Sequence, residues 1–207
     1  MKRLATVCLV ALVAAALTPQ ALDAGIGFKL GYSSASLSQA SATPLPFNFG
    51  PLSSVTGGLS FEAGLGFISI DPELLYVRMG GRYEVDASNS LEFRHDYIQV
   101  PVLVKLNIIP VGPIRPFLCA GAYGAYLVNA KGVLVLDGVP SEEDMADNYE
   151  RFDYGLIGGA GLAFKLPGIS LSIEGRFNYG LQNLLKDPAP GDSMKNECWM
   201  ALAGISF

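Results

Sequence analysis

Large apolar residues alternate with small or polar ones along much of this chain, and this alternation limits its possible folds more than any other feature. It is cleanest in the run ISLSIEGRFNYGL, residues 169–181. A period of two places successive side chains on opposite faces of a β-strand, whereas a helical stripe repeats about every 3.6 residues. The run therefore predicts a strand with one bulky apolar face and one face of serine, glycine and charged groups.

Stretches with this period recur from residue 25 to the last residue. The third is the least regular, because Leu75 and Val77 fall among its polar positions and Pro72 cannot donate to a strand ladder. The fifth is expected to turn Phe117 and Cys119 outward, unless a bulge reverses it. The eight predicted strands are 26–33, 59–67, 70–83, 97–107, 117–127, 153–165, 169–181 and 198–207.

The composition excludes several classes of protein. Half of the residues are hydrophobic and 16% are charged, yet beyond residue 24 no window holds the roughly 18 consecutive apolar residues that a membrane-spanning helix needs. The abundance of apolar and aromatic residues argues against a disordered chain. A net charge of −5 at pH 7 would repel phosphates, so no nucleic-acid partner is expected.

The face that carries the bulky side chains distinguishes a membrane barrel from a soluble one. The polar faces are crowded with Gly, Ala and Ser, which fit the narrow interior of an eight-stranded barrel. The bulky apolar faces suit contact with lipid. The predicted fold is all-β, an eight-stranded antiparallel up-and-down transmembrane β-barrel, closed because an exposed sheet edge is untenable in hydrocarbon. A soluble lipocalin-like barrel is the alternative.

The first residues match a secretory signal peptide. Two basic residues precede an apolar run from Leu4 to Leu17, and small residues lead to Ala24. This run is too short to cross a bilayer. Residues 1–24 are expected to be removed, although a cut after Ala21 fits nearly as well. Residues 25–207 are then expected to form one barrel domain, surrounded by the lipid of a bacterial outer membrane.

Loop lengths predict the orientation of the barrel. Outer-membrane barrels have short periplasmic turns and long extracellular loops, and here short and long breaks between strands alternate. Both termini are therefore expected in the periplasm, with the long loops at residues 36–54, 84–92, 129–152 and 182–196. Aromatic residues near strand ends predict girdles at the membrane interfaces. They are Tyr32, Phe67, Tyr76, Tyr97, Phe117, Phe164, Tyr179, Trp199 and Phe207.

Charged residues on the inward faces form the first candidate site. Their signs are mixed, and charges in a narrow lumen persist only when they are paired and hydrogen-bonded. An internal ion-pair cluster is favoured over an ion-conducting path, because side chains fill an eight-stranded lumen. The predicted lumen charge cluster is Lys29, Glu62, Glu73, Lys105, Glu174 and Arg176, with Asp71, Asp153 and Lys165 also facing inward.

The single histidine, His95, lies beside Asp96 where a long loop re-enters a strand, with Ser88 and Ser90 nearby. A histidine, an acidic residue and a serine are the residue types used in nucleophilic catalysis, but their presence in one segment is weak evidence without a known geometry. We therefore expect a solvated loop histidine and no catalytic residue. The sequence holds no His/Cys metal cluster and no phosphate-binding loop, so no metal and no cofactor are expected.

Two cysteines and one acidic loop complete the candidates. Cys119 is expected to face lipid and Cys198 the lumen, on strands that are not neighbours, so both are predicted to be free thiols. The loop 129–152 contains six acidic and two basic residues, a net charge of −4. It could bind a divalent cation or a basic partner, although a solvated loop accounts for it as well.

Several segments resemble the PorT-like outer-membrane β-barrel family, many of whose members are called porin-like for their fold. They are 96–105, 116–124, 153–161 and 202–207, and the resemblance covers essentially residues 25–207. It implies an eight-stranded barrel in the outer membrane of a Gram-negative-type bacterium, and no single activity. The outward Phe207 is similar to the terminal signal that the barrel-assembly machinery recognises, which implies that this machinery is a partner during insertion.

The favoured function is a non-enzymatic outer-membrane barrel, structural or partner-binding through its extracellular loops. Its extracellular or envelope partner is unknown. A small porin or a component of an export assembly is the second hypothesis. A lipid-modifying outer-membrane enzyme centred on His95 is the third.

Overall fold

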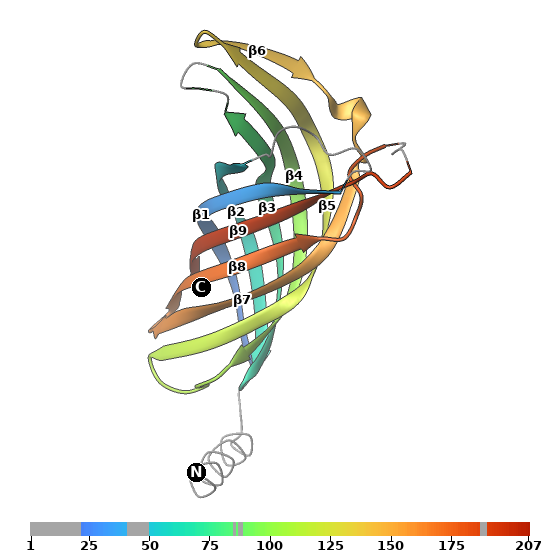
Figure 1. Cartoon of the computed structure of the whole chain (residues 1–207). Helices are drawn as coiled ribbons and strands as arrows, with labels where there is room; N and C mark the ends of the chain where they lie inside the picture. Colours follow the sequence, from blue (N-terminus) through green and yellow to red (C-terminus); the bar gives the residue numbers. More distant parts are fainter. Residues whose placement is uncertain (1–21, 41–49, 85, 87–88, 187–189) are drawn as a thin grey trace, which may run out of the picture.

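The computed structural model describes residues 22–40, 50–84, 86, 89–186 and 190–207 (Figure 1). The expected signal peptide lies almost wholly outside the described residues, and so does Ser88. Within these ranges, no helix has the length and apolar character needed to cross a membrane.

Antiparallel β-strands make up nearly all of the described chain. They form where the sequence alternates, because that pattern matches the two faces of a pleated strand. The strands are β1 (Leu22–Ala40), β2 (Gly50–Leu65), β3 (Ile68–Glu84), β4 (Ser90–Asn107), β5 (Ile114–Leu136), β6 (Val139–Asp144), β7 (Phe152–Leu166), β8 (Ile169–Gly180) and β9 (Ser193–Ser206), with a one-turn 3₁₀ helix, η1 (Ala146–Asn148), after β6.

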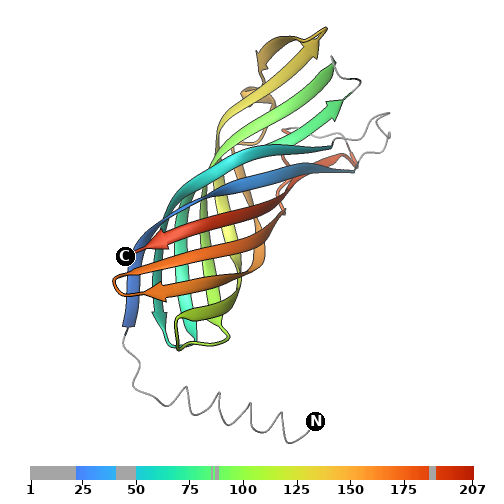
Figure 2. The ribbon, with the colours of Figure 1, turned by 90° about the vertical axis from the view of Figure 1, so that its left-hand side faces the viewer.

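Eight of these strands close into a ring in the order β1, β2, β3, β4, β5, β7, β8, β9. Every neighbouring pair is antiparallel, and β1 closes the ring by pairing with β9. At the closure, Gly31 lies opposite Thr56 on one side and Leu202 on the other. Figures 1 and 2 show the ring from two directions. The predicted eight-stranded antiparallel barrel is confirmed, and β6 is an addition that pairs with β5.

The bulky apolar side chains point away from the lumen. On β1, Phe28 is 56% exposed and Leu30 is 65% exposed, whereas Lys29 between them is 5% exposed. On β8, Ile173 is exposed while Glu174 and Arg176 are buried. A soluble barrel would show the reverse arrangement, so the outer wall is built for lipid.

Two strands contradict the expected facing of particular residues. Tyr97 and Phe117, expected in the aromatic girdles, are buried inside the barrel, and so is Cys119, which was expected to face lipid. The pairing of β4 with β5 explains the burial of Phe117 and Cys119. Phe117 lies opposite Asn107, an inward residue of β4, and every second residue of β5 after Phe117 also points inward. The outward positions of β5 carry Leu118, Tyr126 and Val128, with small residues between Leu118 and Tyr126.

The apolar outer wall ends at a row of aromatic residues. On β4 its outward residues run from Ile98 to Leu106, close to the 9–11 residues of a tilted membrane strand. Tyr76 and Tyr126 lie opposite Ile98, and Phe152 lies opposite Tyr126. This row marks the membrane interface on the side away from the short turns, which is the outer side in outer-membrane barrels. Residues 90–96 of β4 therefore lie beyond the lipid.

Above the aromatic row, β3, β4, β5 and β6 continue as a curved sheet, which we call the extracellular extension (Figure 2). The loop expected at 129–152 is therefore largely wrong, because β5 continues to Leu136 and β6 follows it. The connection expected at 84–92 lies where it was predicted, between the end of β3 at Glu84 and the start of β4 at Ser90. The sequence pattern missed these strands because neither face of the extension contacts lipid, so the contrast between its faces is weak.

Candidate functional site

Charged side chains from five strands meet in the half of the lumen nearest the short turns. The structure brings together every residue proposed for the lumen charge cluster and places Asp71 among them. They are Lys29 of β1, Glu62 of β2, Asp71 and Glu73 of β3, Lys105 of β4, and Glu174 and Arg176 of β8.

The cations of this cluster each contact more than one carboxylate. The guanidinium of Arg176 binds both oxygens of Glu73 at 2.6 Å and reaches Glu174 at 2.7 Å. Lys29 Nζ lies 2.9 Å from carboxylate oxygens of Asp71 and Glu174. These groups have lost most of their water, and their ionised forms are stabilised inside the barrel because each cation is paired with more than one carboxylate.

The opposite side of the cluster is built around Lys105. Its Nζ lies 2.6 Å from Asp71 Oδ2 and 3.0 Å from Glu62 Oε2, and it stands over the ring of Phe117. Glu62 also accepts a hydrogen bond of 2.8 Å from Ser69. Asp71 therefore links Lys29 and Lys105, and the cluster spans the lumen.

Polar and apolar side chains fill the lumen beyond this cluster. Asn178 donates to Gln99 at 3.2 Å, and Asn196 donates to Asp153 at 2.9 Å. The space between these polar groups holds fully buried apolar side chains. They include Leu75, Val77, Met79, Leu103 and Leu127.

His95 lies above these layers, inside the extracellular end. It is 1% exposed, and its ring meets that of Tyr149 edge-on with 4.3 Å between centroids. The expectation of a solvated loop histidine is therefore wrong, because His95 is an inward residue of β4 capped by the segment after η1. Burial lowers the pKa of His95 from 6.5 to about 4, and the nearby Asp96 carboxylate opposes this only in part.

The other members of the proposed histidine, acid and serine set lie elsewhere. Asp96 points to the outer wall, where it binds Arg78 at 2.6 Å. Ser90 lies at the far end of β4, opposite Glu84 and Val135. The described part of this set therefore has no nucleophile, base and acid within reach of one another.

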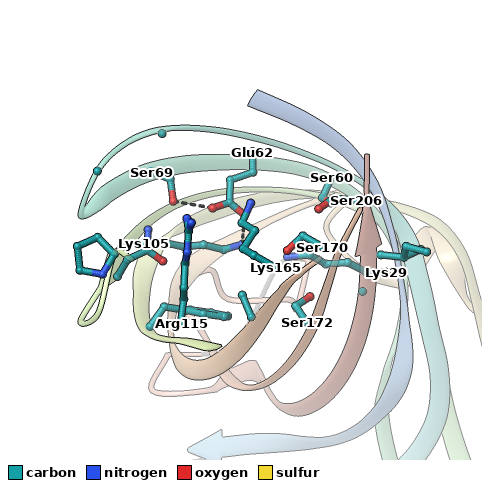
Figure 3. A pocket seen from close by; sticks show the side chains of 18 of the residues that line it. Lys29, Ser60, Glu62, Ser69, Lys105, Arg115, Lys165, Ser170, Ser172 and Ser206 are labelled. Atoms are coloured by element: carbon teal, nitrogen blue, oxygen red, sulfur yellow. Dashed lines mark hydrogen bonds and ion pairs between the residues drawn. The ribbon is translucent and has the colours of Figure 1, made fainter. Parts of the chain in front are cut away.

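A cavity of about 420 Å³ lies between the charge cluster and the short turns (Figure 3). Its lining includes Gly66 and Pro110, from two of the short turns, and Lys165, which lies in β7 just before the third, so it opens at that end of the barrel. Figure 3 shows Arg115 and Lys165 reaching into it beside Glu62 and Lys105.

At the other end, the two faces of the extracellular extension differ. Its outer face carries a ladder of ion pairs in which Glu92 contacts Arg94 at 2.6 Å and Glu142 contacts Lys131 at 2.7 Å. The Lys131 ammonium lowers the pKa of Glu142, which lies on β6 outside the membrane. The face that continues the lumen wall exposes apolar side chains. These are Leu134, Leu136 and Val139, which are 41%, 55% and 68% exposed.

The family comparison adds a decisive observation to this geometry. Residues 18–186 match the family model described as outer membrane protein beta-barrel domain. The chain belongs to this family of outer membrane β-barrels. Comparison with curated protein sequences finds no match.

Solved structures agree with this outer membrane β-barrel fold. OprG from Pseudomonas aeruginosa is 10% identical, with a TM-score of 0.50 over 89% of this chain and 95% of that chain. Neisserial surface protein A is 15% identical, with a TM-score of 0.48 over 89% and 97%. Ail of Yersinia pestis is 16% identical, with a TM-score of 0.44 over 89% and 99%. At these identities the likeness concerns the fold alone. Membership of the outer membrane β-barrel family places the protein in the bacterial outer membrane.

Both described cysteines of this outer membrane β-barrel are buried free thiols, as predicted, although Cys119 faces the lumen. No group of three metal-ligating side chains gathers anywhere in the described ranges.

Sequence reasoning missed the cavity and the apolar face of the extension. Arg115 and the exposed Val139 lay in segments read as turn or loop, where no alternation shows which way they point.

Proposed function

We propose that this protein is a non-enzymatic outer-membrane barrel that presents its extracellular extension as a binding surface for an extracellular or envelope partner. The single observation that carries the proposal is the exposed apolar face of β5 and β6 above a lumen filled with side chains. A filled eight-stranded lumen is poorly suited to diffusion, whereas an exposed apolar patch rimmed by polar groups is typical of interaction sites.

The register of the hairpin places the apolar residues on one face. Val139 lies directly opposite Leu136, and Ser141 lies opposite Leu134. Leu91 of β4 lies opposite Leu134 on the other side and widens the patch. Because all of these residues lie beyond the aromatic row, lipid does not cover them.

The edge of the extension indicates the chemistry of the partner. β6 pairs with β5 on one side and ends the order of the described strands, so its other side is a sheet edge. It carries Glu142, Glu143 and Asp144, all exposed. An acidic edge resists pairing with copies of itself and favours a partner with basic residues beside an apolar surface.

Site-specific photocrosslinking tests the proposal. A photoreactive amino acid at Val139 should form an adduct with an extracellular protein on intact cells, and Leu136→Asp should abolish both the adduct and binding of the purified partner. Val111, 66% exposed in the turn between β4 and β5, is the matched control: Val111→Asp should leave binding unchanged. Equal adducts from Val139 and Val111 would contradict the proposal.

Two competing functions have their own tests. A small porin or export component would give discrete openings in planar bilayers, whereas the filled lumen is expected to give none above baseline. A lipid-modifying enzyme would lose its product with His95→Ala, so an unchanged lipid A mass spectrum in that variant supports the non-enzymatic assignment. The burial of His95 and the outward direction of Asp96 favour that result.

We further assign the chain to the PorT-like group within its family and propose insertion by the barrel-assembly machinery. The segments that carry the resemblance form wall strands: residues 96–105 lie in β4 and residues 153–161 in β7. Phe207 follows β9, is 64% exposed and donates its backbone N–H to Ile26. Phe207→Ala is expected to lower the folded fraction in the outer membrane, measured by heat-modifiable migration on a gel.

A further inference from the structure

The cavity at the short-turn end of the lumen has no role in the proposed function. Its volume of about 420 Å³ falls within the range of small-molecule sites, about 300–1,000 Å³. The charge cluster forms its inner limit, and the filled lumen lies behind that cluster. The cavity is therefore a closed-ended pocket that opens on the periplasmic side.

The charged groups that line this pocket are mostly cations. Lys29 and Lys105 lie at its inner end, and Arg115 and Lys165 reach in near the opening, against one carboxylate, Glu62 (Figure 3). The remaining carboxylates of the cluster, Asp71, Glu73 and Glu174, are buried behind the lining. A molecule entering from the periplasm thus meets positive charge first.

Hydroxyl groups supply uncharged donors around these cations. They belong to Ser60, Ser170, Ser172 and Ser206, whereas the hydroxyl of Ser69 already donates to Glu62. Glycine keeps part of the wall open, because a Cβ at Gly204 would lie 2.5 Å from Ser172 Oγ and 3.3 Å from Lys29 Cγ. Guanidinium, ammonium and hydroxyl groups together are the donor set that proteins use for carboxylate and phosphate oxygens.

We propose that this periplasmic pocket binds a small oxyanion, a molecule with a carboxylate or phosphate group. Arg115 donates from its Nε to the carbonyl oxygen of Gly112 at 3.3 Å, which holds its guanidinium at the opening. A guanidinium is a planar group suited to two oxygens of one such anion. Lys165 adds a flexible ammonium from the neighbouring strand β7. The serine hydroxyls donate to the remaining oxygens. The anion enters and leaves by the same opening, so binding does not require conduction.

Titration calorimetry of the full chain in detergent tests the proposal. Inorganic phosphate and succinate are titrated separately at constant ionic strength, with chloride as the reference. Saturable heat with either oxyanion is expected, and the one that binds tells a phosphate ligand from a carboxylate ligand. Heats equal to those of chloride for both oxyanions would overturn the proposal.

Variants tie the binding to the pocket. The double variant Arg115→Gln/Lys165→Met should weaken the affinity at least tenfold. Lys131→Met, which removes a cation from the extracellular extension, should change it less than twofold. Equal affinity in the double variant and Lys131→Met would overturn the proposal.

A second variant leaves every charge in place. Ser172→Leu fills the pocket and should also weaken binding at least tenfold, while heat-modifiable migration confirms that each variant is folded. Unchanged binding in folded Ser172→Leu would overturn the proposal. Because Leu136 and Val139 lie at the other end of the molecule, loss of the extracellular partner would leave this result unaffected.

Discussion

At the scale of single residues, Arg176 is the side chain on which the lumen charge cluster most depends. It is 1% exposed and contacts Glu73 and Glu174, two carboxylates from different strands. Removing one partner from a buried ion pair leaves the other charge without compensation, which costs more than the pair itself contributes.

Arg176→Met is therefore expected to lower the free energy of unfolding by about 3–5 kcal/mol. Urea unfolding of the protein in lipid vesicles, followed by heat-modifiable migration, measures this value. The control Lys131→Met removes an exposed ion pair and should cost less than about 1 kcal/mol. A loss in Arg176→Met no larger than that of the control would contradict the role of the cluster.

His95 gives a pH dependence whose sign follows from its environment. Its pKa is about 4 in the folded protein and about 6.5 when unfolded, so the unfolded chain binds more protons between these values. Stability from the neutral ring is complete above pH 6.5 and is lost as the pH falls toward 4. At pH 5 the loss is about 2 kcal/mol.

The comparison of wild type with His95→Gln at pH 7.5 and pH 5.0 isolates this contribution. Carboxylates titrate in both proteins, so the difference between their pH responses belongs to His95. Wild type should lose about 2 kcal/mol more than the variant. Identical responses would show that the ring is solvated in solution.

At the scale of elements, Gly80 marks the place where β3 enters the extracellular extension. Its φ of +140° lies in a region that other residues rarely adopt, and an added Cβ would collide with the carbonyl oxygen of Phe93 on β4. Arg78 lies on the barrel side of this glycine and Arg82 on the extension side. A side chain at this position is therefore expected to strain the pairing of β3 with β4 within the extension.

Gly80→Val is expected to expose the β5–β6 hairpin to added protease on intact cells while the barrel keeps its heat-modifiable migration. The strain is about 1–3 kcal/mol. Gly124→Val is the control, because a Cβ at this outward position meets nothing within 4 Å. Equal proteolysis in the two variants would contradict a specific role for Gly80.

The sequence predicted the elements best where they contact lipid. In β8 the membrane imposes one bulky and one small face, so the pattern fixed the facing of Ile173 and Glu174 correctly. In the extension, water contacts both faces and β6 was taken for a loop. The sequence predicted that Lys29 belongs to a cluster of inward charges, but which carboxylates it contacts depends on the geometry of the barrel. The pocket at Arg115 depends on how three turns converge, which no local pattern records.

At the scale of the whole molecule, the short turns and the extracellular extension lie at opposite ends of the barrel (Figure 1). Outer-membrane barrels keep their short turns in the periplasm. The pocket beside Arg115 should then open to the periplasm, and the hairpin at Val139 should face the outside.

Cysteine labelling of intact cells tests this orientation. A membrane-impermeant maleimide should label Val139→Cys on intact cells and Val111→Cys only after the outer membrane is permeabilised. Cys119 and Cys198 are buried, so the wild-type background should be low. Labelling of Val111→Cys alone on intact cells would reverse the orientation.

The charge cluster also constrains how the protein can enter its membrane. Glu174 and Arg176 on β8 find their partners Lys29 and Glu73 on β1 and β3, which become near neighbours across the lumen when β1 joins β9. A sheet inserted before that seam forms would lack these two contacts and hold incompletely paired charges near hydrocarbon, which lipid penalises. We therefore expect bilayer entry and seam formation to be coupled, so that a half-inserted folding intermediate does not accumulate.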